Sequence, residues 1–97
     1  VRQVGNPVAW IGRWGRPADP TARTIAEALT KAGFQTTPSD DVLLDVWKKL
    51  ALNVVTLPTS ALTGFTADRL IAHEPMMDVM RALLRETVTV AEAEGIS

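Results

Sequence analysis

The stretch "SDDVLLDVWKKLALNVVTLP" at residues 39–58 divides the chain into two kinds of sequence. Before it, short apolar runs alternate with one helix-like segment, whereas every later pattern is helical. Ser39 or Asp40 can cap a helix that begins near Asp41, and Pro58 is expected to perturb or end that helix. Apolar residues recur at helical spacing along the stretch: Leu43, Trp47, Leu50, Val54 and Leu57. We therefore predict one long, buried helix at the centre of the chain.

Two polar side chains, Lys49 and Asn53, interrupt the apolar pattern of this helix. Residues four apart are neighbours on a helix surface. An ammonium beside a carboxamide offers several N–H donors and one acceptor, which suits a carbonyl or carboxylate held against the helix. A lysine can also give a proton to a carbonyl oxygen that gains a hydride. The same spacing fits an exposed lysine and a core asparagine satisfied by the backbone, so spacing alone is a weak signal.

The first 41 residues carry the signals of an α/β layer. "VRQV" (1–4) and "VAWIG" (8–12) are short apolar runs separated by the turn sequence "GNP", which predicts a hairpin. A helix is predicted to follow, with Asp19 as its N-cap, Pro20 as its first residue and Gly33 at the left-handed position after its end.

The helix that follows Asp19 has one apolar stripe, which we expect to be buried. The members of the stripe are Ala22, Ile25, Ala28, Leu29 and Ala32. The segment "FQTTP" (34–38) is predicted to be a short strand. The glycines of "GRWGRP" (12–17) lack the G-x-G-x-x-G spacing, and we expect no strand-to-helix turn of a dinucleotide site there.

Two further helices are predicted beyond Pro58. A short one starts at Thr66 and runs through "ADRLIA", and a long one is introduced by Pro75 and runs to Gly95. The long helix has an apolar side that we expect to face inward: Met76, Met80, Leu83, Leu84, Thr87, Val88 and Ala91.

The composition is that of ordinary globular material, about one domain or less. Lys and Arg number 10 against 11 Asp and Glu, without a basic block, so neither nucleic acid nor an anionic membrane is an expected partner. The uncharged run from Leu50 to Ala67 contains Pro58 and Gly64, so it is not predicted to span a membrane. The chain has no cysteine, which fits a reducing compartment such as the cytoplasm, and its one histidine, His73, predicts no metal site.

The segment "DVWKKLALNVVTLPTSALTG" (45–64) resembles the central motif of the ketopantoate reductase family, the 2-dehydropantoate 2-reductases. In that motif, W-x-K-L-x-x-N opens the C-terminal helical domain and P-x-x-A-L-T follows. "VAWIGRWG", "KAGF" and "SDD" resemble the end of the family's cofactor domain, and "EPMMDVMRALLRETVTVAEAEGI" resembles its next long helix. The similarity therefore spans nearly the whole chain.

This resemblance implies a mixed fold. Residues 1–41 are expected to be the α/β remnant of an NADP-binding Rossmann-type domain. Residues 42–97 are expected to begin an all-α C-terminal domain of the 6-phosphogluconate dehydrogenase C-terminal type, which carries substrate binding and dimerisation.

The activity that the resemblance implies is NADPH-dependent reduction of a 2-keto acid, 2-dehydropantoate or a similar compound, in pantothenate biosynthesis. Lys49 matches the family's catalytic lysine and Asn53 a substrate-binding asparagine. The glycine-rich cofactor motif is expected upstream of residue 1, so the fragment alone is expected to be inactive. Its partners are expected to be the substrate, the rest of the enzyme chain and a second copy of the protein.

Two positions depart from the family's pattern. Leu57 and Ala67 stand where family members often have asparagines, which favours a more apolar 2-keto acid. Two alternatives remain open: a non-catalytic helical interaction or dimerisation module, and a fragment of a 3-hydroxyacid dehydrogenase, which also uses a Lys-x-x-x-Asn pair. A glycine-rich strand–turn–helix upstream in the intact gene product would favour an enzyme.

Overall fold

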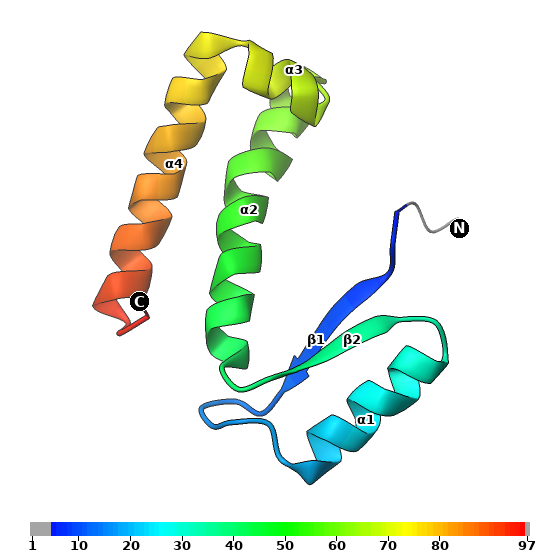
Figure 1. The fold of residues 1–97 in the computed structure, drawn as a ribbon. Coiled ribbons are helices and arrows are strands. Elements are labelled where there is room, and N and C mark those ends of the chain that lie inside the picture. The colour runs from blue at the N-terminus through cyan, green and yellow to red at the C-terminus, as the bar shows by residue number, and fades with distance from the viewer. Residues whose placement is uncertain (1–4, 97) are drawn as a thin grey trace. The chain divides into compact units, whose positions relative to one another are not determined.

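The computed structural model describes residues 5–96 and contains two strands and four helices within that range (Figure 1). Their bounds are β1 Val8–Gly12, α1 Pro20–Lys31, β2 Gln35–Ser39, α2 Val42–Thr63, α3 Ala67–Ala72 and α4 Glu74–Ala93. The chain forms two compact units, Val1–Asp45 and Val46–Ser97, and the boundary between them falls within α2. The predicted hairpin needs "VRQV" (1–4), which lies outside the described residues.

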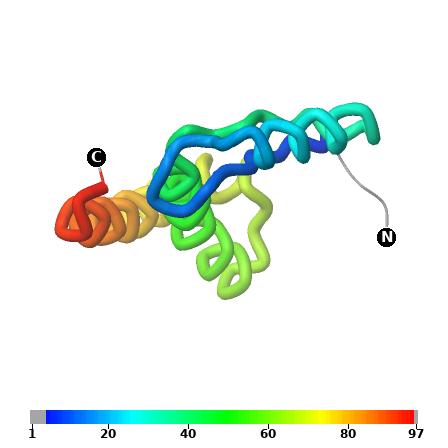
Figure 2. The backbone as a smooth tube through the Cα atoms, turned by 90° about the horizontal axis from the view of Figure 1, so that it is seen from below, coloured from blue at the N-terminus to red at the C-terminus, as the bar shows by residue number. Residues whose placement is uncertain are grey.

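The first unit is a β-α-β arrangement. β1 and β2 pair in parallel, with Val8 opposite Gln35 and Gly12 opposite Ser39. Parallel neighbours require a crossover connection, and α1 provides it, packing along both strands (Figure 2). This two-stranded sheet, followed by helices only, agrees with the mixed architecture predicted from the sequence. The assignment of the first unit to a Rossmann-type domain stays a prediction.

Both ends of α1 are fixed by the residues that the sequence indicates. The Asp19 side chain accepts a hydrogen bond from the backbone N–H of Ala22 at 2.8 Å, and Pro20 opens the helix. After the helix, Gly33 has a φ of 99°, and the N–H of Phe34 donates to the carbonyl of Leu29 at 2.9 Å. This is a Schellman ending, which a left-handed residue at position 33 makes possible.

The buried face of α1 is narrower than predicted. Ala22 and Ala26 are buried, whereas Ile25, Ala28 and Ala32 are exposed. Two strands give the helix a narrow surface to cover, so the residues along its centre line are buried and those at the margins are not. The prediction was therefore wrong for three members of the stripe, and it omitted Ala26.

The passage from β2 into α2 is fixed by three side chains. The Asp41 carboxylate accepts a hydrogen bond from the N–H of Leu44 at 3.1 Å, which makes Asp41 the N-cap. The buried Ser39 hydroxyl accepts from the N–H of Asp41 at 3.2 Å and donates to the Asp45 carboxylate. The predicted cap at Ser39 or Asp40 was thus wrong, because Ser39 braces the turn that precedes the helix.

Helix α2 does not end at Pro58 but continues to Thr63. A proline inside a helix lacks the N–H that would bond to the carbonyl four residues earlier. Pro58 therefore removes the backbone hydrogen bond to the carbonyl of Val54, and Gly64 ends the helix with a φ of 68°. Of the two expected outcomes, an end of the helix at Pro58 was wrong, because the helix continues to Thr63.

The second unit closes through α3 and α4, which pack against each other. Both helices begin where the sequence predicts, with Thr66 as the N-cap of α3 and Pro75 in the first turn of α4. Figure 1 shows α3 joining the end of α2 to the start of α4. The ending at Gly95 is again of the Schellman type, with the N–H of Ile96 donating to the carbonyl of Ala91 at 2.9 Å.

The core of the second unit is small. Its buried residues are Thr59, Leu70 and Met80, one from each of the three helices. Of the inward side predicted for α4, Met80 is buried, whereas Leu84 and Val88 are exposed. Periodicity identified the correct face but not how far along the helix that face is covered. Within residues 5–96, no helix has the length and apolar character needed to cross a membrane.

Candidate functional site

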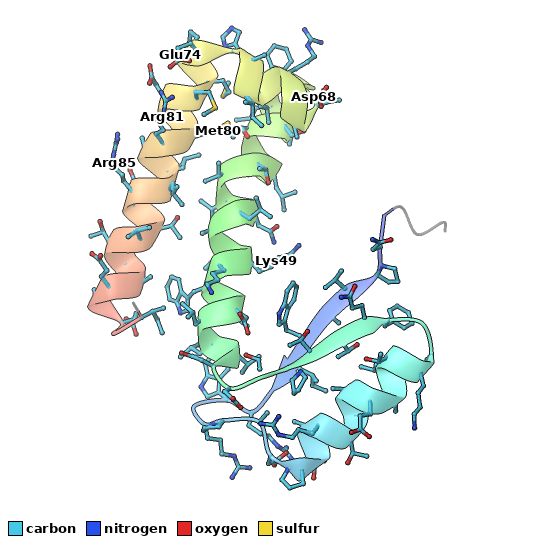
Figure 3. The ribbon with its side chains drawn as sticks, viewed as in Figure 1. Lys49, Asp68, Glu74, Met80, Arg81 and Arg85 are labelled. Carbon is cyan, nitrogen blue, oxygen red and sulfur yellow. The ribbon has the colours of Figure 1, made fainter. Side chains whose placement is uncertain are left out.

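Lys49 and Asn53 occupy successive turns on one side of α2, in the second unit. Lys49 is exposed and Asn53 is half-buried. Lys49 extends from the side of the helix in Figure 3. With 1.5 Å of rise per residue, the two side chains are about 6 Å apart along the axis, so one small ligand can reach both.

Neither side chain is engaged by other groups of the protein. Among residues 5–96, neither Lys49 nor Asn53 takes part in any hydrogen bond or ion pair that the structure shows, whereas Thr56 and Thr63 on the same helix bond to carbonyls one turn earlier. An asparagine satisfied by the backbone was the alternative for position 53, and the structure gives it no support. The ammonium and the carboxamide are therefore available to a ligand.

The surroundings of the pair are apolar and exposed, which the sequence analysis missed. Val46, Leu50 and Leu57 are 48%, 43% and 60% exposed. At 100° per residue, these three lie within about 40° of one another on α2, and Asn53 borders them. The spacing i, i+4, i+7, i+11 of Val46, Leu50, Asn53 and Leu57 was the available signal. The prediction of a buried helix was wrong for Leu50, whereas Leu57 lies in one row with Lys49 and Asn53, as the four-residue spacing predicts.

Lys48 and Ala67 lie outside the row formed by Lys49 and Asn53. Lys48, next to Lys49, is also exposed but is directed about 100° around the helix. Ala67 is the first residue of α3 and is exposed. Lys48 thus offers a matched lysine that does not share the row of Lys49 and Asn53.

The connection from β1 to α1 is a strand-to-helix turn, contrary to the prediction for "GRWGRP" (12–17). Its chemistry nevertheless does not suit a dinucleotide. The start of α1 is occupied by the Asp19 carboxylate, which accepts from Ala22 and pairs with Arg13 at 2.7 Å. The hydrogen bond from Ala22 lowers the pKa of Asp19, and Arg13 and Arg16 lower it further.

Gly12 in this turn has a structural role. A Cβ at this position would lie 2.8 Å from both the Ser39 carbonyl oxygen and the Val42 Cβ. The glycine allows the end of β1 to approach the start of α2 closely, rather than allowing a phosphate to approach the backbone. Because pyrophosphate binding needs a free helix N-terminus and an open glycine turn, the residues of this unit do not fit the NADPH pyrophosphate site.

The ion pairs of α4 lie within that helix. Arg81 binds the carboxylates of Glu74 and Asp78 along one side of α4, and these hydrogen bonds raise the pKa of the guanidinium. Met80 and Arg81 project to opposite sides of α4 in Figure 3. His73 is exposed and precedes α4 as its N-cap residue. Within residues 5–96, no group of three potential metal ligands is close enough to hold an ion.

Comparison with known proteins relates this arrangement to one family. The family described as "Ketopantoate reductase PanE/ApbA C terminal" matches residues 41–97, which include the Lys49–Asn53 pair. A 2-dehydropantoate 2-reductase of Halobacterium salinarum is 32% identical over 97 residues, covering 100% of this chain and 32% of that protein. One from Mesorhizobium japonicum is 35% identical over 72 residues, covering 74% of this chain and 22% of that protein.

A solved structure gives the same relationship. The crystal structure of a candidate ketopantoate reductase from Ralstonia solanacearum MolK2 superposes on this chain with a TM-score of 0.83 and 29% sequence identity. The match covers 91% of this chain and 28% of the other. The chain thus spans about a third or less of the length of the relatives it matches. On the family match to residues 41–97, the chain belongs to the ketopantoate reductase family, as its C-terminal region.

Proposed function

We propose that this chain carries the substrate-binding side of an NADPH-dependent oxidoreductase that reduces a 2-keto acid to the 2-hydroxy acid. In this proposal Lys49 is the catalytic residue and Asn53 binds substrate. Membership of the family supports the reaction class, and the relatives named above are 2-dehydropantoate 2-reductases. The single observation that carries the proposal is the Lys49–Asn53 pair on one side of α2, whose side chains have no hydrogen-bond or ion-pair partner among residues 5–96.

The roles of the two side chains follow from their chemistry. The Lys49 ammonium donates a hydrogen bond to the keto oxygen, which polarises the carbonyl. As that oxygen gains negative charge, Lys49 gives it a proton, so it becomes the neutral hydroxyl group of the 2-hydroxy acid. The Asn53 carboxamide, about 6 Å away along the helix, donates to the substrate and fixes its orientation against α2.

When bound to the full-length protein, NADPH would supply the hydride for the keto carbon held by Lys49 and Asn53. The first unit offers no free helix N-terminus for its pyrophosphate, because Asp19 caps α1. We therefore assign the pyrophosphate site of NADPH to a part of the full-length protein other than the start of α1. In the same proposal, the enzyme acts in the cytoplasm, in pantothenate biosynthesis. Exposed apolar residues of α4, such as Leu84 and Val88, support assembly of the protein into a homo-oligomer.

The test is an activity assay on the full-length protein that carries this chain. We expect NADPH oxidation to depend on an added 2-keto acid. Asn53→Ala should raise KM more than it lowers kcat, because it removes a contact present before and during the reaction. Oxidation of 3-hydroxyacids with no reduction of 2-keto acids would instead identify a 3-hydroxyacid dehydrogenase. No turnover of either class would favour a non-catalytic interaction module.

A further inference from the structure

The apolar residues beside the polar pair bear on the identity of the substrate. Leu57 lies one turn beyond Asn53 and is 60% exposed, and Leu50 lies on the turn before and is 43% exposed. At 100° per residue, Leu50, Asn53 and Leu57 fall within about 60° of one another. Any molecule bound to Lys49 and Asn53 therefore also meets an exposed aliphatic surface.

We propose that Leu57 is a specificity-determining residue that contacts the carbon chain of the 2-keto acid beyond its keto carbon. The preferred substrate is then a 2-keto acid whose chain is purely alkyl at that point. This inference rests on the proposed function and adds to it the class of substrate side chain.

The order of side chains along α2 determines the orientation of the substrate. The keto oxygen accepts hydrogen bonds and the carboxylate carries the negative charge, so they lie at the ammonium of Lys49 and the amide of Asn53. Leu57 begins about 6 Å further along the axis, a distance that a branched chain of three or four carbons can cover. An uncharged alkyl chain is the part of the substrate that suits Leu57.

A hydroxyl on that chain is disfavoured for a defined reason. The leucine side chain has neither a donor nor an acceptor, so a hydroxyl buried against it loses its bonds to water without replacement. Apolar pockets discriminate against an added hydroxyl by roughly 10²-fold. An asparagine at position 57 would offer the hydroxyl both a donor and an acceptor.

The test compares two substrates that differ in one group: 2-dehydropantoate and 3,3-dimethyl-2-oxobutanoate, which lacks only the C4 hydroxyl. In the full-length protein we expect kcat/KM to be at least about tenfold higher for the compound without the hydroxyl. Leu57→Asn should move the ratio of the two kcat/KM values about tenfold towards 2-dehydropantoate, and Leu57→Met should leave it unchanged.

Leu62→Asn is the matched control, because Leu62 is also on α2, is 89% exposed and is directed about 140° away from Leu57. It should leave the ratio unchanged. A wild-type preference for 2-dehydropantoate, which requires no variant to fold, overturns the inference, as does an equal ratio in Leu57→Asn and Leu62→Asn. If the protein reduces no 2-keto acid, the proposed function fails and this inference with it. If the protein reduces both compounds but Leu57→Asn does not change the ratio of the two kcat/KM values, the inference alone fails.

Discussion

Replacing Leu70 by alanine should destabilise the second unit more than any other single truncation on α3. Leu70 is 0% exposed, whereas the adjacent Ile71 is 62% exposed. Truncating a fully buried leucine removes its transfer free energy and leaves a cavity, at a cost of about 3–5 kcal/mol. Truncating a mostly exposed isoleucine should cost less than about 1 kcal/mol. The difference of more than about 2 kcal/mol is large against the marginal stability of small domains.

Urea denaturation followed by far-UV circular dichroism measures both variants, and amide hydrogen exchange locates the change. In Leu70→Ala, we expect exchange to accelerate first in α3 and α4, which pack against each other. Ile71→Ala, on the next residue of the same helix, controls for the loss of a branched side chain. Equal destabilisation by the two substitutions would refute the assignment of Leu70 to the centre of the core.

Three further predictions concern the first unit. The pKa of Asp19 is lowered in the folded protein, so its contribution to stability is complete above its ordinary pKa of about 4 and is lost as pH falls through the folded value. Asp19→Asn should therefore reduce the fall of the urea midpoint at acid pH. The same dependence of the urea midpoint on pH in the variant and the wild type would contradict this role of Asp19. Gly12→Ala should destabilise by about 1–3 kcal/mol because its Cβ meets the Ser39 carbonyl and Val42, and an unaltered urea midpoint would contradict the close approach. The isolated chain should not bind NADPH in a fluorescence titration, since α1 has no free N-terminus; saturation at roughly micromolar concentration would contradict this.

The ends of helices were predictable where one or two residues carry the whole signal. Asp19 and Pro20 begin α1, and Gly33 and Gly95 follow the ends of α1 and α4, as expected. Such signals are local, because a cap needs only its own hydrogen bond or its own φ. The cap at Asp41 was missed because three polar residues in a row compete for it, and the contact between Ser39 and Asp45 decides among them.

Burial was less predictable than secondary structure. Helical periodicity identifies a face, but it does not say what covers that face. Leu50, Leu84 and Val88 belong to predicted inward faces and are exposed. The site was predictable as a row, because four-residue spacing on a helix is geometry, but the roles of Lys49 and Asn53 rest on family membership and stay a proposal.

The central claim is that Lys49 is the proton donor because of its place on α2, so that the positive charge of a neighbouring lysine cannot replace it. The most direct measurement is kcat/KM for a 2-keto acid in the full-length protein with Lys49→Ala beside Lys48→Ala. The two lysines are adjacent and both exposed, so each substitution removes one positive charge from the same turn. We expect Lys49→Ala to lower kcat by roughly 10²- to 10⁴-fold, and Lys48→Ala to change it by less than about threefold, with cofactor affinity similar in both. Equal effects of the two substitutions, or a loss below about threefold in Lys49→Ala, would contradict the assignment of Lys49 as the proton donor.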